Sequence, residues 1–421
     1  MNFRDRAHQL FVVGVVVTTA HAVDDSFLQP QPGTSAGDHL TAGLVALAAA
    51  ALSLFAYPRV RPGVSALVAL VWSEIALVSG VEALYYAQHG GLSGDDYSGL
   101  IALAAAPLLA GVGISTLWRS RRLNDSRWRR YARRSVTGVV VLFAASLWTL
   151  PFAVSYIGSH VSRGTVPPAS ALGTAHEDVS LHTSDGLRLE GWYVPSRNRA
   201  AVIVFPGRKG SVTRARLLAR HGYGVLLFDR RGEGRSQGDP DSFGWDFDKD
   251  IRAGIQFLQH RREVDADRIG GIGLSVGGEM MLETASQTTD LAAVIAEGAG
   301  ARTAGEEVDD AEGSANKVVA ALTYGMRDLT NSIVQGRRPP ENLKRLVPRI
   351  RRPVFYIYAG PRDVGQLTPD YYRVTRAPKQ LWEARGGHTQ ALATEPHEYE
   401  RRVVSFLDGA LLRGMQSRGD R

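Results

Sequence analysis

The chain has 421 residues, a formal net charge of +7 and no cysteine. The missing cysteines exclude disulfides, thiolate zinc sites and cysteine nucleophiles. A chain of this length is expected to form two or three domains. The hydrophobic fraction of 44% and the mean hydropathy of −0.12 are those of an ordinary soluble protein. That average conceals a division, because almost every long apolar run lies before Ile157 and a mixed, charged sequence follows Gly164.

Residues 1–160 are expected to form an all-α transmembrane domain with a lipid bilayer as its partner. A helix needs about 20 predominantly apolar residues to cross the hydrocarbon core of a bilayer. The first candidate span, residues 8–23, is the shortest and could instead contain the apolar core of a signal peptide, but no convincing cleavage site with small residues follows it. The five predicted spans are 8–23, 40–57, 64–86, 97–118 and 136–157.

Charge in the short loops predicts the orientation of these spans, since Lys and Arg favour the cytoplasmic side. Basic residues precede the first span, separate the second from the third and crowd the loop from Arg119 to Arg134. The alternate loops, Asp24–Asp38 and His89–Asp96, contain Asp but neither Lys nor Arg. The pattern predicts a multi-pass cell membrane protein with a cytoplasmic N-terminus and an extracytoplasmic chain after Ile157. Because no nucleic-acid motif accompanies the basic loop, no nucleic-acid partner is expected.

Polar residues in the apolar half are candidates for function. Glu74 falls near the middle of its span, where a carboxylate is costly enough to mark a possible intramembrane polar site. The alternative is an interhelical hydrogen bond made by the protonated acid. Five more polar residues, on the predicted outer side, could gather around a metal or a proton, or could simply be wetted at the interface. They are His21, Asp24, Asp25, Glu82 and His89.

Residues 179–412 are expected to form an α/β domain, after a linker at 161–178 and before a tail at 413–421. Short β-rich runs alternate with helical patterns, which indicates a doubly wound, mostly parallel sheet. The irregular stretch 301–346 suits a small cap. The predicted strands are Val179–Thr183, Leu187–Val194, Ala201–Phe205, Gly224–Phe228, Arg268–Gly273, Ala292–Ala296, Val354–Ala359 and Lys379–Glu383. The predicted helices are Val212–His221, Asp246–His260, Gly277–Ser286 and His397–Leu411.

Three serines stand in a G-x-S-x-G pattern, namely Ser35, Ser236 and Ser275. A nucleophilic serine of this type needs a sharp turn between a strand and a helix, with glycines that permit the strained backbone. Ser35 lies in a Pro- and Gly-rich loop, and Pro240 breaks any helix after Ser236. Only Ser275 has a predicted strand directly before it and an apolar helical run directly after it, so we predict Ser275 as the nucleophile.

A serine nucleophile needs a base to take its proton and a third group to orient that base. Asp363 follows the predicted strand that begins at Val354, and His388 follows the next strand. Both should therefore lie at the carboxyl edge of the sheet, beside Ser275. The competing residues Asp370 and His397 sit about a turn further from their strands.

The negative charge that develops on the substrate oxygen needs two backbone N–H donors. One is expected from Val276, directly after the nucleophile. The other is expected from Arg208, in the predicted loop after the strand Ala201–Phe205. The Arg208 side chain, with that of Lys209, could also hold an anionic group of a substrate.

Several stretches together resemble the α/β-hydrolase superfamily, particularly its Bem46-like, membrane-tethered branch. They are Thr183–Gly186, Leu189–Pro195, Asp229–Ser236, the serine turn, and Gly387–His388 followed by Pro396–Asp408. The resemblance covers about residues 179–412 and implies a Ser275–Asp363–His388 triad that works without a cofactor or a metal. One departure is Pro206–Gly207, where many relatives have His-Gly at the end of the strand.

The sequence thus predicts a membrane-anchored serine hydrolase that cleaves a carboxylic ester or related acyl compound, with a small-molecule or lipid-like substrate. A peptidase or aminopeptidase of the same fold uses an identical triad and is the nearest alternative. An acyltransferase is a further one. A different class of protein, a transporter or sensor with the hydrolase domain as a receptor module, would require an essential Glu74 and an inactive outer domain.

Overall fold

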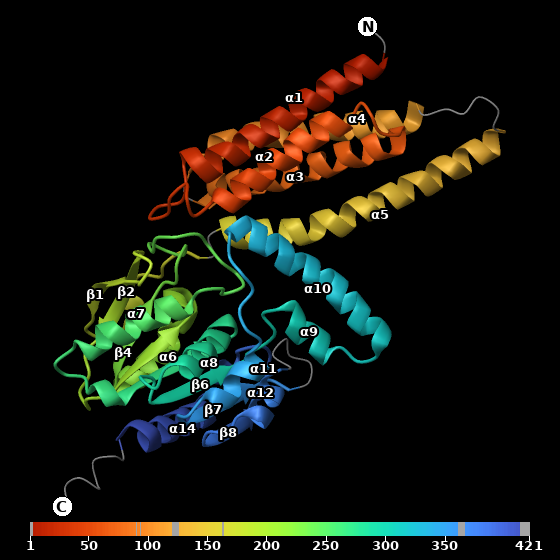
Figure 1. The fold of residues 1–421 in the computed structure, drawn as a ribbon. Helices are drawn as coiled ribbons and strands as arrows, with labels where there is room; N and C mark the ends of the chain where they lie inside the picture. The colour runs from red at the N-terminus through yellow and green to blue at the C-terminus, as the bar shows by residue number, and fades with distance from the viewer. Residues whose placement is uncertain are drawn as a thin grey trace, which may run out of the picture. The chain divides into compact units, whose positions relative to one another are not determined.

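The computed structural model describes residues 3–89, 91–92, 94–119, 126–161, 164–360 and 367–412. Its contacts divide the chain into two compact units (Figure 1). The helical unit comprises Met1–Val161 together with Val319–Arg338. The sheet unit comprises Ser162–Val318 together with Pro339–Arg421. A segment from the middle of the predicted cap therefore groups with the N-terminal helices.

The helical unit begins with five α-helices, and a π-helical turn, η1 (Asp24–Leu28), follows the first. The helices are α1 (Phe3–Val23), α2 (Leu40–Ala56), α3 (Pro62–His89), α4 (Asp96–Arg119) and α5 (Arg127–His160). Small residues let these helices approach closely, as they do in membrane proteins. A Cβ added to Gly80 on α3 would lie 2.5 Å from Leu103 Cβ on α4, and one on Gly14 of α1 would lie 2.6 Å from Leu109.

Within the described residues, four helical stretches are long and apolar enough to cross a membrane. They are Asp5–Leu28, Pro62–His89, Asp96–Arg119 and Tyr131–His160. The predicted span at 40–57 corresponds to α2, which is shorter at 17 residues. Large apolar side chains such as Leu52, Phe143 and Leu150 are exposed on these helices. Their exposure suits a hydrocarbon surrounding, since soluble monomers rarely expose large contiguous apolar surface.

The sheet unit contains one eight-stranded sheet in the order β1-β2-β4-β3-β5-β6-β7-β8. The first two strands pair antiparallel, β2 also pairs antiparallel with β4, and every other pair is parallel. This confirms the predicted mostly parallel α/β fold, with each strand present within two residues of its expected bounds. The strands are β1 (Glu177–His182), β2 (Arg188–Val194), β3 (Ala201–Phe205), β4 (Gly224–Phe228), β5 (Ile269–Leu274), β6 (Ala293–Glu297), β7 (Val354–Tyr358) and β8 (Lys379–Glu383).

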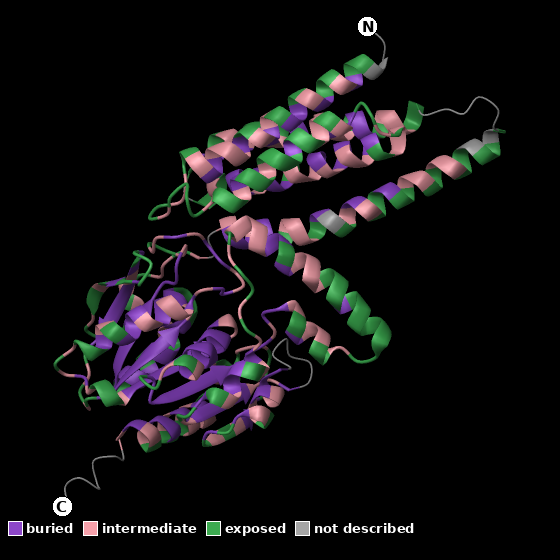
Figure 2. Cartoon of the chain, viewed as in Figure 1, coloured by how far each residue is buried: buried purple, intermediate pink, exposed green. Residues whose placement is uncertain are grey.

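Helices cover both faces of this sheet, so its central strands are buried on both sides (Figure 2). Alternate residues of a strand point to opposite faces. In β3, Ile203 and Phe205 pack in the core that contains residues of α7 and α8, whereas Val202 and Val204 pack in the core that contains residues of α6 and α14. Continuous apolar runs therefore occur in place of an alternating pattern.

The helices of the sheet unit are short except for α10, whose C-terminal part belongs to the helical unit. They are α6 (Gly207–Arg220), α7 (Asp248–Gln259), α8 (Val276–Gln287), α9 (Ala304–Asp310), α10 (Ser314–Gln335), α11 (Leu343–Leu346), α12 (Thr368–Val374), α13 (Ala391–Thr394) and α14 (Pro396–Leu407). The predicted helix at 212–221 begins five residues early, at Gly207, directly after β3. This earlier start changes the role of Arg208.

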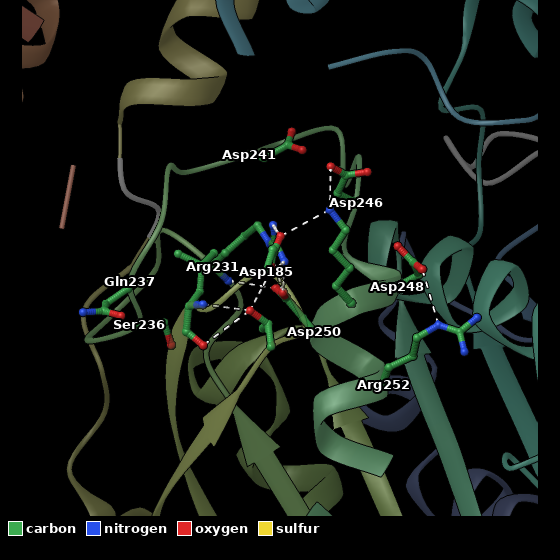
Figure 3. Close-up of polar contacts among 12 residues, drawn as sticks. Asp185, Arg231, Ser236, Gln237, Asp241, Asp246, Asp248, Asp250 and Arg252 are labelled. Carbon is green, nitrogen blue, oxygen red and sulfur yellow. Dashed lines mark hydrogen bonds and ion pairs between the residues drawn. The ribbon is translucent and has the colours of Figure 1, made fainter. Parts of the chain in front are cut away.

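A buried ion-pair network holds the loop that follows β4 (Figure 3). The Arg231 guanidinium donates to Asp250 Oδ1 at 2.6 Å and to Asp185 Oδ2 at 3.0 Å. Lys249 Nζ lies 3.2 Å from the same Asp185 oxygen. Burial raises the pKa of Asp185, but hydrogen bonds from Arg231 and Thr183 outweigh it and hold that pKa below its usual range. The network therefore joins β4, α7 and the turn between β1 and β2.

Asp250→Asn is expected to lower the free energy of unfolding by about 3 kcal/mol, because it leaves a buried guanidinium with only the half-exposed Asp185 as a counter-charge. The Arg231 and Asp250 side chains are 1% and 0% exposed. Pulse proteolysis in increasing urea would measure the change. The exposed Asp290 supplies the control, and equal losses for Asp250→Asn and Asp290→Asn would contradict the prediction.

Candidate active site

Ser275 occupies a sharp turn between β5 and α8. Its backbone has φ +52° and ψ −126°, a conformation that residues other than glycine rarely adopt. Its N–H donates to the carbonyl oxygen of Glu297, at the end of the neighbouring strand β6, at 2.8 Å. The strain at Ser275 is thus held by the sheet, as a nucleophile turn requires.

The two positions on either side of Ser275, Gly273 and Gly277, leave no room for the Cβ of any other residue. A Cβ on Gly273 would lie 2.1 Å from the carbonyl oxygen of Gly277. A Cβ on Gly277 would lie 2.7 Å from the carbonyl oxygen of Phe205, at the end of β3. Neither backbone oxygen can move far, because the turn and the strand hold them. The G-x-S-x-G pattern therefore has a steric reason at this position.

His388 lies in the loop between β8 and α13, and its ring reaches the end of β6. A Cβ placed on Gly298 would lie 2.8 Å from His388 Cε1 and 3.1 Å from Nδ1. Leu274 is paired with Glu297 in the sheet, so Ser275 and Gly298 stand at the same level. The structure thus brings Ser275 and His388 to one edge of the sheet, around the end of β6.

Asp363, the predicted third member, lies outside the described residues. The strand before it, β7, lies between β6 and β8 in the sheet. The competing residues have other environments. Asp370, on α12, lies 2.7 Å from Lys344 Nζ and 2.9 Å from the Arg373 guanidinium. His397 is exposed in the first turn of α14.

The other two G-x-S-x-G serines are engaged in local structure. Ser236 Oγ donates to the carbonyl of Asp229 at 2.6 Å and accepts from the N–H of Glu190 at 3.0 Å. Ser35 Oγ donates to Asp38 Oδ2 at 2.8 Å in an exposed loop. Ser236 lies in the long loop between β4 and α7, and Ser35 lies between η1 and α2, so neither occupies a sharp turn from a strand directly into a helix.

Arg208 does not fit the oxyanion role expected of it. Its N–H, in the first turn of α6, is engaged by a side chain, since it donates to Asp229 Oδ1 at 3.0 Å. The Arg208 side chain is also buried and donates through Nε to Asp229 Oδ2 at 2.9 Å, so it cannot hold an anionic substrate either. Val276 differs, since it is the first residue of α8 and its N–H belongs to the first turn, where helices have no acceptor of their own.

Arg214, on α6, links the serine turn to the histidine loop, a role that sequence reasoning missed. Its Nη2 donates at 2.9 Å to both carboxylate oxygens of Glu297 and at 2.9 Å to the carbonyl of Thr389. Its Nε donates to the Tyr399 hydroxyl at 2.9 Å. Glu297 supplies the carbonyl that binds Ser275, and Thr389 follows His388. The buried pair of Arg214 and Glu297 therefore connects the backbone that holds Ser275 with the backbone next to His388.

A signal for this role existed in the sequence. Arg214 shares a helix face with Ser211, Ala215 and Leu218, all of which are buried. An arginine on the buried face of a helix requires a buried partner, since an unpaired charge there is costly. The partner, Glu297, comes from a strand more than eighty residues away, so only the fold could identify it.

Several polar residues of the helical unit are joined by hydrogen bonds, which is one of the two alternatives that the sequence left open. Ser98 Oγ lies 2.6 Å from Asp24 Oδ2 and 3.0 Å from His21 Nδ1. His21 Nε2 lies 3.3 Å from the Tyr156 hydroxyl, which donates to Glu82 Oε2 at 3.4 Å. The resulting hydrogen-bonded chain joins α1, η1, α3, α4 and α5.

The remaining polar candidates, Asp25, His89 and Glu74, have different contacts. Asp25 Oδ2 lies 3.4 Å from His160 Nε2, beside this chain. His89 instead contacts the carbonyl of Tyr85 on its own helix. The Glu74 Oε2 atom is buried without a hydrogen-bond partner, so Glu74 stands apart from the gathered groups. Within the described residues, no group of three or more His, Asp or Glu side chains is arranged to hold a metal ion.

The mostly parallel eight-stranded sheet, with a strained serine between β5 and α8 and a histidine at the same edge, defines a serine hydrolase of the α/β-hydrolase superfamily. The sequence pattern of the X-Pro dipeptidyl-peptidase family (S15) matches residues 164–385, more than half of the chain. The chain belongs to that family.

Individual relatives match parts of the chain. The uncharacterized protein Rv2307c of Mycobacterium tuberculosis is 36% identical over 171 residues, which cover 38% of this chain and 59% of that protein. The α/β-hydrolase domain-containing protein WAV2 of Arabidopsis thaliana is 29% identical over 115 residues, covering 25% and 37%. The Pyrococcus furiosus esterase Pf2001 aligns at a TM-score of 0.48 with 22% identity, covering 60% of this chain and 98% of that structure.

Arg214→Met is expected to lower kcat on an aryl ester about 100-fold with KM nearly unchanged, because small displacements of catalytic groups have effects of that size. Arg214→Lys, which keeps the charge, should recover part of the activity. Steady-state kinetics would measure both. Arg216, exposed on the same helix, supplies the control. An equal kcat for Arg214→Met and Arg216→Met would contradict the positioning role.

Proposed function

We propose that the protein is a membrane-anchored serine hydrolase that cleaves a carboxylic ester or a related acyl compound. The observation that carries the proposal is the juxtaposition of Ser275 and His388 around the end of β6. A hydroxyl on a strained turn, held by the Glu297 carbonyl, can be approached by an imidazole from the loop after β8. This is the arrangement that activates a serine for acyl transfer.

In the proposed mechanism, Ser275 Oγ attacks the acyl carbonyl while His388 takes the hydroxyl proton. The Val276 N–H stabilises the negative charge on the tetrahedral oxygen. His388 then gives the proton to the leaving group, and an acyl-enzyme forms. Water, activated by the same imidazole, releases the acid. Asp363 is proposed to orient His388, because an imidazole needs a carboxylate partner to hold the productive tautomer.

The apolar helices support the membrane part of the proposal. Four stretches have the length and composition of spans, and the basic loops favour a cytoplasmic N-terminus. The catalytic domain is accordingly proposed to lie on the extracytoplasmic side. The Arg214–Glu297 pair supplies the rigid support that the serine and histidine loops need for catalysis.

A membrane-impermeant fluorophosphonate probe is expected to label intact cells that express the protein, because it reacts with activated serines. Ser275→Ala should abolish the label and Ser236→Ala should keep it. In-gel fluorescence would measure both. If the label disappears with Ser236→Ala and persists with Ser275→Ala, the assignment of the nucleophile is wrong. If wild-type labelling appears only after lysis, catalysis stands and the proposed orientation fails.

A peptidase is the second candidate, favoured by membership of a family named for X-Pro dipeptidyl-peptidases. Amide cleavage uses the same acyl-enzyme route but needs the leaving amine to be protonated. A dipeptidyl activity would further require recognition of a free amino terminus and a proline.

The ester proposal predicts faster turnover of short-chain aryl esters than of Ala-Pro-p-nitroanilide. To decide between the two proposals, kcat/KM on both substrates is measured for the full-length protein in detergent under the same conditions, with Ser275→Ala as the blank. A higher kcat/KM on the Ala-Pro amide would replace the esterase proposal with the peptidase one. Turnover of neither substrate by a protein that the fluorophosphonate labels would point to a different acyl group.

A further inference from the structure

Helix α10, most of which (from Val319 on) groups with the helical unit, carries an exposed apolar surface. Among the described residues after Val154, the large hydrophobic side chains that are exposed all belong to α10. They are Val318, Val319, Leu322 and Leu329, at 59%, 58%, 61% and 54% exposure. Figure 2 shows the exposed residues along this helix. Among the described residues of the sheet unit, only Val318 is a large apolar side chain that is exposed, so the exposed surface of α10 resembles that of the helical unit, to which most of α10 belongs.

These side chains lie along one stripe. At about 100° per residue, Val318, Leu322 and Leu329 fall within about 40° of one another around the helix, and Val319 extends the sector to about 100°. Met326 and Ile333 fall inside the same sector and are partly exposed. The buried polar residues Asp328 and Asn331 point elsewhere. An apolar stripe about 100° wide, with polar residues around it, is the pattern of an amphipathic helix.

The C-terminal part of α10 is packed with the membrane-type helices, because Val319–Arg338 belongs to the helical unit. Ser155 Oγ, near the end of α5, donates to the carbonyl of Arg327 at 3.3 Å. A Cβ on Gly336, just after α10, would lie 3.1 Å from the carbonyl of Asp38. Both contacts fall at the ends of the spans that are proposed to face outward. They place α10 at the level of one membrane surface.

The occupant that fits this stripe is lipid. The helix that contacts α10, α5, itself exposes large apolar side chains near that contact, among them Leu150 and Val154, so α10 packs on a helix whose surface already suits hydrocarbon. Basic residues accompany the helix, with Lys317 on it and Arg337 and Arg338 just beyond, whereas Arg327 pairs with Asp328 at 2.8 Å. Interfacial helices combine an apolar face with basic residues that attract anionic head groups.

We infer that α10 is an interfacial helix whose Val318–Leu322–Leu329 stripe lies in the outer surface of the bilayer, on anionic lipid. The inference rests on the membrane part of the proposed function. In this position α10 inserts its apolar stripe about 5–10 Å into the boundary between head groups and acyl chains.

The missing native cysteines allow a direct test on the full-length protein in vesicles of anionic and zwitterionic lipid. A single cysteine is introduced as Leu322→Cys, as Leu329→Cys, or at the control position as Lys317→Cys, five residues and about 140° away from Leu322 around the helix. Each is labelled with an environment-sensitive fluorophore. Lipid-borne quenchers should quench the label at 322 and at 329 at least about threefold more strongly than at 317, and aqueous iodide should act in the reverse order.

Equal quenching at 322 and 317, or stronger iodide quenching at 322, would overturn the inference. The labels at 322 and 329 should stay protected from iodide when the protein is diluted into excess lipid. Loss of that protection on dilution would also overturn the inference, since a second copy of the chain would then be what covers the stripe. Alkaline carbonate extraction separates the two proposals. A protein that is extracted from the vesicles has no membrane-spanning unit, whereas one that is retained but unquenched at 322 and 329 refutes the α10 inference alone.

Discussion

The hydrogen bond from the Ser275 N–H to the Glu297 carbonyl joins the serine turn to strand β6. A backbone at φ +52° has a conformational cost of about 1–3 kcal/mol and persists only where its surroundings hold it. Here the holding groups are a sheet edge, two glycines without room for a Cβ, and the α8 helix. The position of Ser275, the proposed nucleophile, follows from these constraints.

The same strand end carries a second constraint, the buried pair of Arg214 and Glu297. Glu297 carries both the carboxylate of this pair and the carbonyl that binds Ser275, and the Arg214 guanidinium also donates to the carbonyl of Thr389. Burial and the neighbouring Glu297 carboxylate raise the pKa of Tyr399, so its hydroxyl keeps its proton and completes the cluster. A buried pair satisfied on all sides can specify a geometry even where its net effect on stability is small.

The two units place their apolar residues according to different surroundings. The sheet unit buries the large apolar residues of its strands on both faces, as water requires. The helical unit exposes many such residues and gathers its polar groups inside, around His21 and Tyr156. Helix α10 comes from the chain segment of the sheet unit but carries an exposed stripe like that of the helical unit, which is why a lipid surface is the partner that fits it.

The sequence by itself determined the eight strands, the apolar helices and the choice of Ser275, because these depend on local periodicity and on glycines at fixed spacing. For His21, Asp24 and Glu82 it left open whether they gather or are wetted at the interface, and the fold shows that a hydrogen-bonded chain joins them. The tertiary structure decided the rest. Only the fold shows that Arg208 is engaged by Asp229, that Arg214 contacts Glu297 and Thr389 beside the Ser275 and His388 loops, and that part of α10 packs with the helical unit. Each depends on contacts between residues distant in the chain, which no local pattern encodes.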